Sequence, residues 1–233
     1  GNEIERLQAE VEALREAKVH TGWVKPDEAY EAAVLRWLDR LWTTPGRPFF
    51  AALEPLRARL AFHGAVNSLA WTLVKIAAPG APDFYQGTEL HDFSLVDPDN
   101  RRPVDYARRA ALLRDLKAEA ERDLPGLPGR LLESWTDGRA KLFTVWRGLA
   151  ARARHARLFR DGAYLPLAGQ GRLGDHVLAF ARRLSGLPGA AADPAAPPAG
   201  SPDETLAVLL APLYPSELCP VGQWPVGDVW EDA

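Results

Sequence analysis

The segment Pro79–Arg102 sets the tightest limit on how this chain can fold. Pro79-Gly80 interrupts an apolar approach, and the short run centred on Phe84-Tyr85 then suits a strand. A loop dense in carboxylates, with an amide, an aromatic ring and two arginines, follows Gly87. Helical patterns precede and follow this segment, so the local order is helix–strand–loop–helix. That order is typical of an α/β barrel, in which functional groups gather at the carboxyl ends of the strands.

The composition is that of an ordinary globular chain. Of the 233 residues, 47% are hydrophobic and 25% are charged, which suits one large domain or two modest ones. The net charge of -3 gives no electrostatic reason to expect nucleic acid or an anionic membrane as a partner. The single cysteine, Cys219, excludes an intrachain disulfide and a cysteine-based metal cluster, which favours a reducing, cytoplasmic setting.

The sequence shows no stretch with the pattern of a membrane-spanning helix or a signal peptide. No apolar run approaches the roughly 18–20 residues that a membrane-spanning helix needs. The amino end is a charged amphipathic segment rather than a signal peptide. The chain contains no methionine and opens within a helical pattern, so we expect a piece of a longer protein whose amino-terminal part is missing.

Hydrophobic periodicity predicts that the first two thirds of the chain are helical. Asp27 is placed to cap the second helix, and the third helix has a possible break at Gly64. Leu124–Gly129 is rich in proline and glycine, which predicts a break between helices. The predicted helices are 2–18, 28–42, 48–76, 104–122 and 141–158.

The last third of the chain changes to a strand pattern. Ala163–Leu167, His176–Arg182 and Thr205–Pro212 each resemble a strand, and a Pro-, Ala- and Gly-rich run over Leu187–Asp203 reads as a surface loop. Gln223–Trp230 would add a further turn or strand. The sequence therefore predicts a helical part with one strand, followed by a small antiparallel β-region.

The loop after the predicted strand combines the side chains that glycoside chemistry uses, namely carboxylates for catalysis and amides and aromatic rings for hydroxyl recognition. Asp83 and Asp105 can instead be turn or helix caps, and the two arginines can simply pair with neighbouring acids. The candidate substrate-binding residues of this loop are Tyr85, Gln86, Glu89, Asp92, Asp97, Asp99, Asn100, Arg101 and Arg102.

Two further candidates lie between the first two helices. His20 and Trp23 can stack on a sugar or bond to it, but they also suit a turn histidine and a core tryptophan. His63 lies on a long apolar helix and suits a structural histidine with satisfied nitrogens. The sequence has no spaced histidine pair, no paired cysteines and no acidic calcium loop, so we expect no metal site and no cofactor.

Pro79–Glu89 resembles the last barrel strand of the α-amylase superfamily. More narrowly, the chain resembles the maltooligosyl trehalose synthase family, from Pro79 through Tyr106 and in further stretches that follow the family's order. Gly22 and His91 depart from it, at positions where serine and tryptophan are usual. The further stretches are Arg15–Trp23, Pro26–Tyr30, Asn67–Leu73, Asp137–Arg147, Leu158–Leu167 and Val221–Asp232.

The resemblance implies an α/β fold in two parts. Residues 1–158 would be the last part of a catalytic (β/α)8 TIM barrel with a helical insertion, mostly helical with one barrel strand. Residues 159–233 would be an incomplete antiparallel C-terminal β-domain. In the superfamily the catalytic acids lie on earlier barrel strands, so the resemblance implies no catalytic residue in this chain. The loop acids would shape sugar subsites, with Tyr85 and Gln86 at the strand end and the arginines orienting the acids.

The activity that the resemblance implies is an intramolecular transglucosylation. The reducing-end α-1,4 bond of a maltooligosaccharide would become an α,α-1,1 bond, which gives maltooligosyl trehalose. The partners would be the maltooligosaccharide and the missing amino-terminal part of the same protein. Two alternatives stay open: an α-glucan hydrolase or glucosidase of the same superfamily, and a non-catalytic sugar-binding module.

Overall fold

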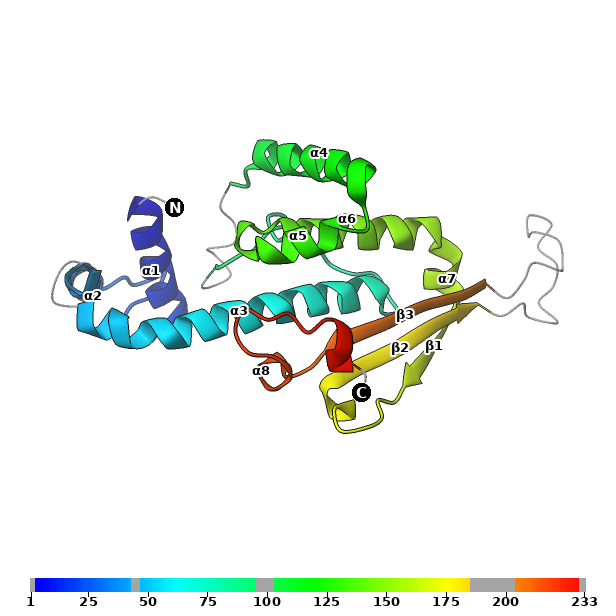
Figure 1. Ribbon diagram of the computed structural model, residues 1–233. Helices are drawn as coiled ribbons and strands as arrows, with labels where there is room; N and C mark the ends of the chain where they lie inside the picture. Colours follow the sequence, from blue (N-terminus) through cyan, green and yellow to red (C-terminus); the bar gives the residue numbers. More distant parts are fainter. Residues whose placement is uncertain (1–2, 43–46, 95–102, 185–203, 231–233) are drawn as a thin grey trace.

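A computed structural model of the chain describes residues 3–42, 47–94, 103–184 and 204–230. Within these ranges the molecule is mostly helical, with one three-stranded antiparallel sheet (Figure 1). The helices are α1 (Glu3–Ala17), α2 (Glu28–Trp42), α3 (Arg47–Ala77), α4 (Tyr106–Asp123), α5 (Leu127–Glu133), α6 (Arg139–Arg154), α7 (Ala156–Asp161) and α8 (Pro215–Leu218). The strands are β1 (Ala163–Leu167), β2 (Val177–Leu184) and β3 (Glu204–Pro212).

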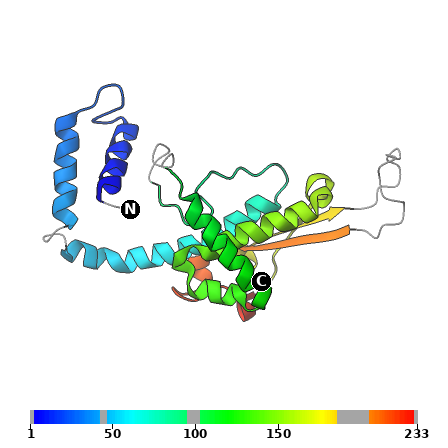
Figure 2. The ribbon, with the colours of Figure 1, turned by 90° about the horizontal axis from the view of Figure 1, so that it is seen from above.

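The long helix α3 is the element on which the others are assembled. Its carboxyl-terminal half packs against α6 and β3, while its amino-terminal half extends toward the α1–α2 hairpin (Figures 1 and 2). The predicted break at Gly64 is wrong, because α3 runs unbroken through that position. A glycine lowers helix stability, but the packing of its buried neighbours Phe62, Ala65 and Val66 holds the helix together.

Among the residues that the structure describes, three hydrophobic clusters form the core. The first joins α3 and α7 to the sheet through side chains that include Ala70, Phe159 and Phe180. The second packs α4, α5 and α6 together around Leu116 and Leu127. The third anchors the last described segment, and its buried members are Phe62, Val66 and Cys219.

The sheet has the order β1-β2-β3, and its three strands confirm the three predicted from alternation. β2 is the central strand and carries the buried residues Ala179, Phe180, Ala181 and Arg182. Pro166 lies in β1, which is an edge strand, where a residue without an N–H can be tolerated. A register shift between Arg182 and Arg183 marks an irregularity in the pairing of β2 with β3.

Two arginine side chains donate hydrogen bonds to the backbone carbonyls at the end of α3. Arg152 of α6 donates hydrogen bonds to the carbonyls of Ile76, Ala78 and Gly80, and Arg182 of β2 donates to that of Ala77. The last carbonyls of a helix have no partner within it and carry partial negative charge, so cationic donors suit this position. The two side chains fix the point at which the chain leaves α3 toward Phe84-Tyr85.

The predicted strand at Phe84-Tyr85 is not found. Residues 81–85 belong to no helix or strand, and the only sheet in the described ranges is the antiparallel one. A strand needs a neighbour to complete its hydrogen-bond ladder. The predicted small antiparallel sheet is thus confirmed, while the (β/α)8 barrel stays a prediction.

Several predicted boundaries also need correction. Lys141–Leu158 is not one helix, because α6 ends at Arg154 and α7 begins at Ala156. Leu124–Gly129, predicted as a break between helices, contains the start of α5, where a proline occupies the first turn. At Gly227–Trp230 the chain forms a short 3-10 helix instead of a strand. The predicted domain boundary between residues 158 and 159 falls within α7, and the division into domains stays a prediction.

Candidate functional site

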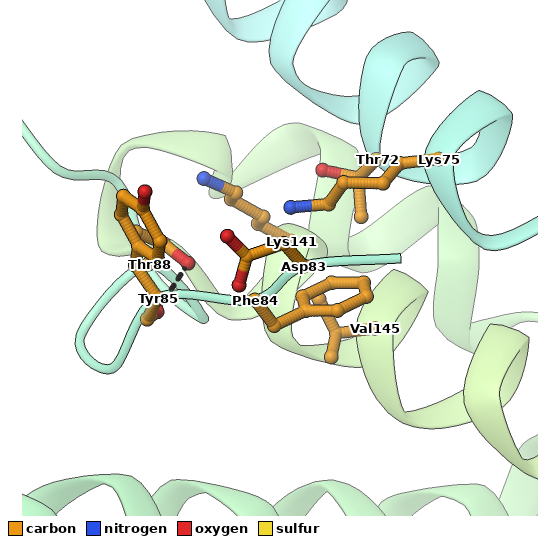
Figure 3. A pocket seen from close by; sticks show the side chains of 8 residues that line it. All are labelled: Thr72, Lys75, Asp83, Phe84, Tyr85, Thr88, Lys141 and Val145. Carbon is orange, nitrogen blue, oxygen red and sulfur yellow. Dashed lines mark hydrogen bonds between the residues drawn. The ribbon is translucent and has the colours of Figure 1, made fainter. Parts of the chain in front are cut away.

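The candidate site is a cavity of about 330 Å³ beside the end of α3 (Figure 3). Three elements contribute to it: the last turns of α3, the loop after α3, and the first turns of α6. The cavity therefore has a wall on two packed helices, which hold its side chains more rigidly than a loop alone can. The lining residues are Thr72, Lys75, Asp83, Phe84, Tyr85, Thr88, Lys141 and Val145.

Among the predicted site residues that the structure describes, Tyr85 alone lines this cavity. Its side chain is 60% exposed. A tight turn fixes its backbone, because its carbonyl accepts hydrogen bonds from the Thr88 amide at 3.2 Å and the Thr88 hydroxyl at 2.7 Å. Gly87 completes the turn with a φ of 94°, which a glycine adopts without steric cost. The result is an aromatic face presented to solvent at the mouth of the cavity.

Glu89 and Gln86 hold the loop against α4. Arg109 donates from Nε to Glu89 Oε2 at 2.9 Å and from Nη2 to the Gly87 carbonyl at 2.7 Å. Glu89 Oε2 also accepts from the Gly87 amide at 3.1 Å. The Tyr106 hydroxyl donates to Gln86 Oε1 at 2.6 Å. The structure thus places these two predicted site residues in contacts that position the loop, outside the lining of the cavity.

Asp92 stabilises a turn within the loop. Its Oδ1 accepts hydrogen bonds from the Ser94 amide at 3.1 Å and the Ser94 hydroxyl at 2.6 Å, which is an Asx-type turn. Asp97, Asp99, Asn100, Arg101 and Arg102 lie outside the described residues. Their predicted role in substrate binding stays a prediction.

Two lysines in the cavity were missed by the sequence analysis. Lys75 of α3 places its Nζ 3.9 Å from the centre of the Phe84 ring, a cation–π contact. Burial lowers the pKa of Lys141 of α6 below its ordinary value, and the positive charge of Lys75 adds to this shift, while Asp92 and Glu89 oppose it. One signal was available: only five of the 28 basic residues are lysines, and these two lie on helices with buried apolar faces.

A second hollow lies at the connection between α1 and α2. Lys18–Lys25 line a space of about 610 Å³, which is open and shallow. A buried network holds its base, in which Arg15 donates from Nε and Nη2 to both oxygens of Glu31, at 2.9 and 2.8 Å. The Thr21 hydroxyl donates to Glu31 at 2.6 Å and accepts from the Asp27 amide at 2.9 Å.

His20 and Trp23 belong to this second hollow. The His20 ring lies 5.0 Å from the ring of Tyr30, and the Trp23 indole N–H donates to Glu16 at 2.8 Å. Trp23 is 45% exposed, so it is not the core tryptophan that one reading predicted. The α1–α2 hairpin stands apart from α4 and α6 (Figure 2), so these two residues do not share a cavity with Tyr85.

The Arg15–Glu31 pair makes the stability of the hairpin depend on pH. Hydrogen bonds from Arg15 and Thr21 lower the pKa of Glu31 to about 2, from an ordinary value of 4.5. Because the folded-state pKa is depressed, the pair contributes its full stabilisation above about pH 4.5, and this contribution is lost as the pH falls toward 2. We expect urea unfolding to show a decline in stability across that window that is smaller in Glu31→Gln. An equal decline in both proteins would contradict this prediction.

His63 lies in α3. His63 is buried, and its two ring nitrogens lie within hydrogen-bonding distance of the carbonyls of Arg59, at 3.0 Å, and Cys219, at 3.1 Å, as expected of a structural histidine. Across the described ranges, no group of three or more His, Cys, Asp or Glu side chains is arranged to hold a metal ion. In the same ranges, no helix combines the length and apolar character of a membrane-spanning segment.

The fold resembles solved enzymes. One, a maltooligosyl trehalose synthase, matches with a TM-score of 0.61 and 29% identity over 78% of this chain and 24% of its own. Another, from Sulfolobus tokodaii and described as a hypothetical maltooligosyl trehalose synthase, matches with a TM-score of 0.57 and 30% identity over 78% of this chain and 23% of its own. These matches show that about 78% of this chain has the fold of part of a maltooligosyl trehalose synthase structure.

The comparison of sequences points to the same enzymes as the comparison of structures. Proteins from two strains of Mycobacterium tuberculosis, each described as "Putative maltooligosyl trehalose synthase", are 38% identical over 170 residues, which is 73% of this chain. The chain is therefore homologous to the maltooligosyl trehalose synthases, and the match spans 19% of the length of these curated relatives. No family model matches the sequence.

Proposed function

We propose that this chain is the carboxyl-terminal portion of an enzyme that converts the reducing-end α-1,4 linkage of maltooligosaccharides to an α,α-1,1 linkage. The observation that carries the proposal is the 38% identity over 170 residues to the curated relatives, with the fold match at a TM-score of 0.61 in support. The matched region includes only a fraction of the relatives' length, so the activity belongs to a longer protein. The partner of this chain is then the amino-terminal part, which supplies the catalytic acids.

The chemistry proposed for the longer protein is a retaining double displacement. A carboxylate attacks the anomeric carbon, a carboxylic acid protonates the departing glucose, and the freed glucose attacks the glycosyl-enzyme through a different hydroxyl. Water competes for that intermediate, so the site must stay closed while the glucose turns. In this scheme the described loop contributes Tyr85 at a wall of the sugar site, and Glu89 with Arg109 holds the loop in place.

The test is a chimera in which these 233 residues replace the homologous region of a Mycobacterium tuberculosis relative. With maltopentaose as substrate, we expect reducing ends to disappear without release of glucose. The 233-residue chain alone is expected to give no turnover, and the unmodified relative is the matched control. A folded chimera that leaves maltopentaose untouched would count against the proposal.

The same assay separates the second candidate, an α-glucan hydrolase or glucosidase. A hydrolase releases glucose and raises the total number of reducing ends, because the glucose and the shortened chain each carry one, whereas the synthase gives a non-reducing product of unchanged mass. Mass spectrometry of the product together with a reducing-end assay distinguishes the two reactions. Accumulation of free glucose as the main product would favour the hydrolase.

A further inference from the structure

We propose that Lys75, Asp83 and Lys141 form a subsite for an uncharged, hydroxyl-rich ligand, namely one glucosyl unit of a maltooligosaccharide. The inference rests on the proposed function for the identity of the ligand and adds to it three residues that the sequence analysis did not assign to the site. The residues come from α3, from the loop after α3 and from α6. Figure 3 shows both ammonium groups and the carboxylate directed into the same cavity.

The polar groups of this cavity have unused hydrogen-bonding capacity. Within the described residues, the Lys141 ammonium and the Asp83 carboxylate have no hydrogen bond and no ion pair. An ammonium group offers three donors, and a carboxylate offers acceptors on both oxygens. A few convergent polar groups with open valences, placed in a concavity beside aromatic rings, are the usual construction of a small-molecule site.

The charges favour a neutral ligand over an anion. Two lysines alone would suit a phosphate or a carboxylate, but Asp83 lies with them in the cavity lining. Glu89 and Asp92 add negative charge near Lys141, since both oppose the fall in its pKa. A dianion would be repelled by Asp83, whereas sugar hydroxyls can accept from the lysines and donate to the carboxylate.

The rings and the volume agree with a single sugar unit. One face of Phe84 is covered by Lys75 at 3.9 Å, which leaves Tyr85 as the open aromatic surface for the C–H face of a pyranose. A volume of about 330 Å³ lies at the lower end of the range of roughly 300–1,000 Å³ that is typical of ligand pockets. The site therefore suits one ring of an oligosaccharide.

The experiment follows the lysine side chains by NMR. The chain contains five lysines, Lys18, Lys25, Lys75, Lys117 and Lys141, so their ammonium signals are few enough to resolve. The 233-residue chain is titrated with maltotriose and, separately, with inorganic phosphate. We expect maltotriose to shift the signals of Lys75 and Lys141 and to leave Lys117, which does not line the cavity, unchanged.

Variants make the assignment specific. Lys141→Met keeps most of the apolar stem and removes the charge, and we expect it to weaken maltotriose binding roughly tenfold, which is the loss of one hydrogen bond to a charged group. Asp83→Asn, at an exposed position that does not contribute to the core, is expected to weaken binding as well. Lys117→Met is the matched control and should bind like the parent protein.

Two results would overturn the subsite. Phosphate that moves the two lysine signals at lower concentration than maltotriose would make the cavity an anion site. Signals that stay unmoved by maltotriose would remove it as a sugar site. Both results are independent of the reaction catalysed: a chimera that releases glucose would refute the synthase proposal, yet the lysine titration would still decide whether this cavity binds sugar.

Discussion

Replacing Arg182 by alanine is expected to lower the free energy of unfolding by about 3 kcal/mol or more. The Arg182 side chain is 1% exposed and lies in the central strand β2. Besides the Ala77 carbonyl at 3.4 Å, it donates to the carbonyls of Phe159 at 3.0 Å and Gly162 at 2.7 Å. Truncation leaves these buried acceptors without a partner and opens a cavity between α3, α7 and the sheet.

The neighbouring arginine supplies the control. Arg183 is exposed, so Arg183→Ala should change stability by no more than about 0.5 kcal/mol. Urea unfolding, followed by circular dichroism, measures both variants against the parent. A third variant, Arg182→Met, restores much of the lost volume without the hydrogen bonds, so it separates packing from carbonyl binding. Equal effects at positions 182 and 183 would contradict the role assigned to Arg182.

Leu116→Ala is the second substitution with a large expected effect. The Leu116 side chain is fully buried at 0% exposure and packs with Leu127 and Leu131 in the cluster that joins α4, α5 and α6. Removing a buried leucine costs about 2–5 kcal/mol, because the transferred surface is lost and a cavity remains.

Leu124, which is 36% exposed just after α4, is the matched control for Leu116. The same chemical change there should cost less than at Leu116, since about a third of Leu124 stays in contact with water in the folded protein. Denaturant midpoints of the two variants, measured side by side, test the difference. A Leu116→Ala protein as stable as Leu124→Ala would show that the α4–α6 cluster does not form as described.

Local patterns predicted much of the fold. The strand alternation in Ala163–Leu167 gave β1 with the same ends, and Asp27 begins α2, as predicted, by accepting a hydrogen bond from the Tyr30 amide at 2.9 Å. These features depend on residues close together in the sequence. The start of α5 was missed because its prolines and glycines read as a turn, whereas burial of Leu127 against α4 keeps it helical.

The candidate site was harder to predict, because its residues come from distant elements. Tyr85, one of the predicted site residues, lines the cavity, but Glu89 bonds to Arg109 and does not line it. The residues next to an acidic residue in a polar loop do not indicate in which direction its side chain points. Lys75 and Lys141 are 66 positions apart (141 − 75), and only the packing of α6 against α3 brings them together.

A proline within α3 affects where this helix can bend. This helix has a proline, Pro55, in the half that leads toward the α1–α2 hairpin (Figure 2). A proline removes one backbone hydrogen bond within a helix and is the commonest origin of a bend. Because the backbone hydrogen bond is missing at Pro55, a bend of α3 at this position would move the α1–α2 hairpin, and with it Trp23, relative to Tyr85.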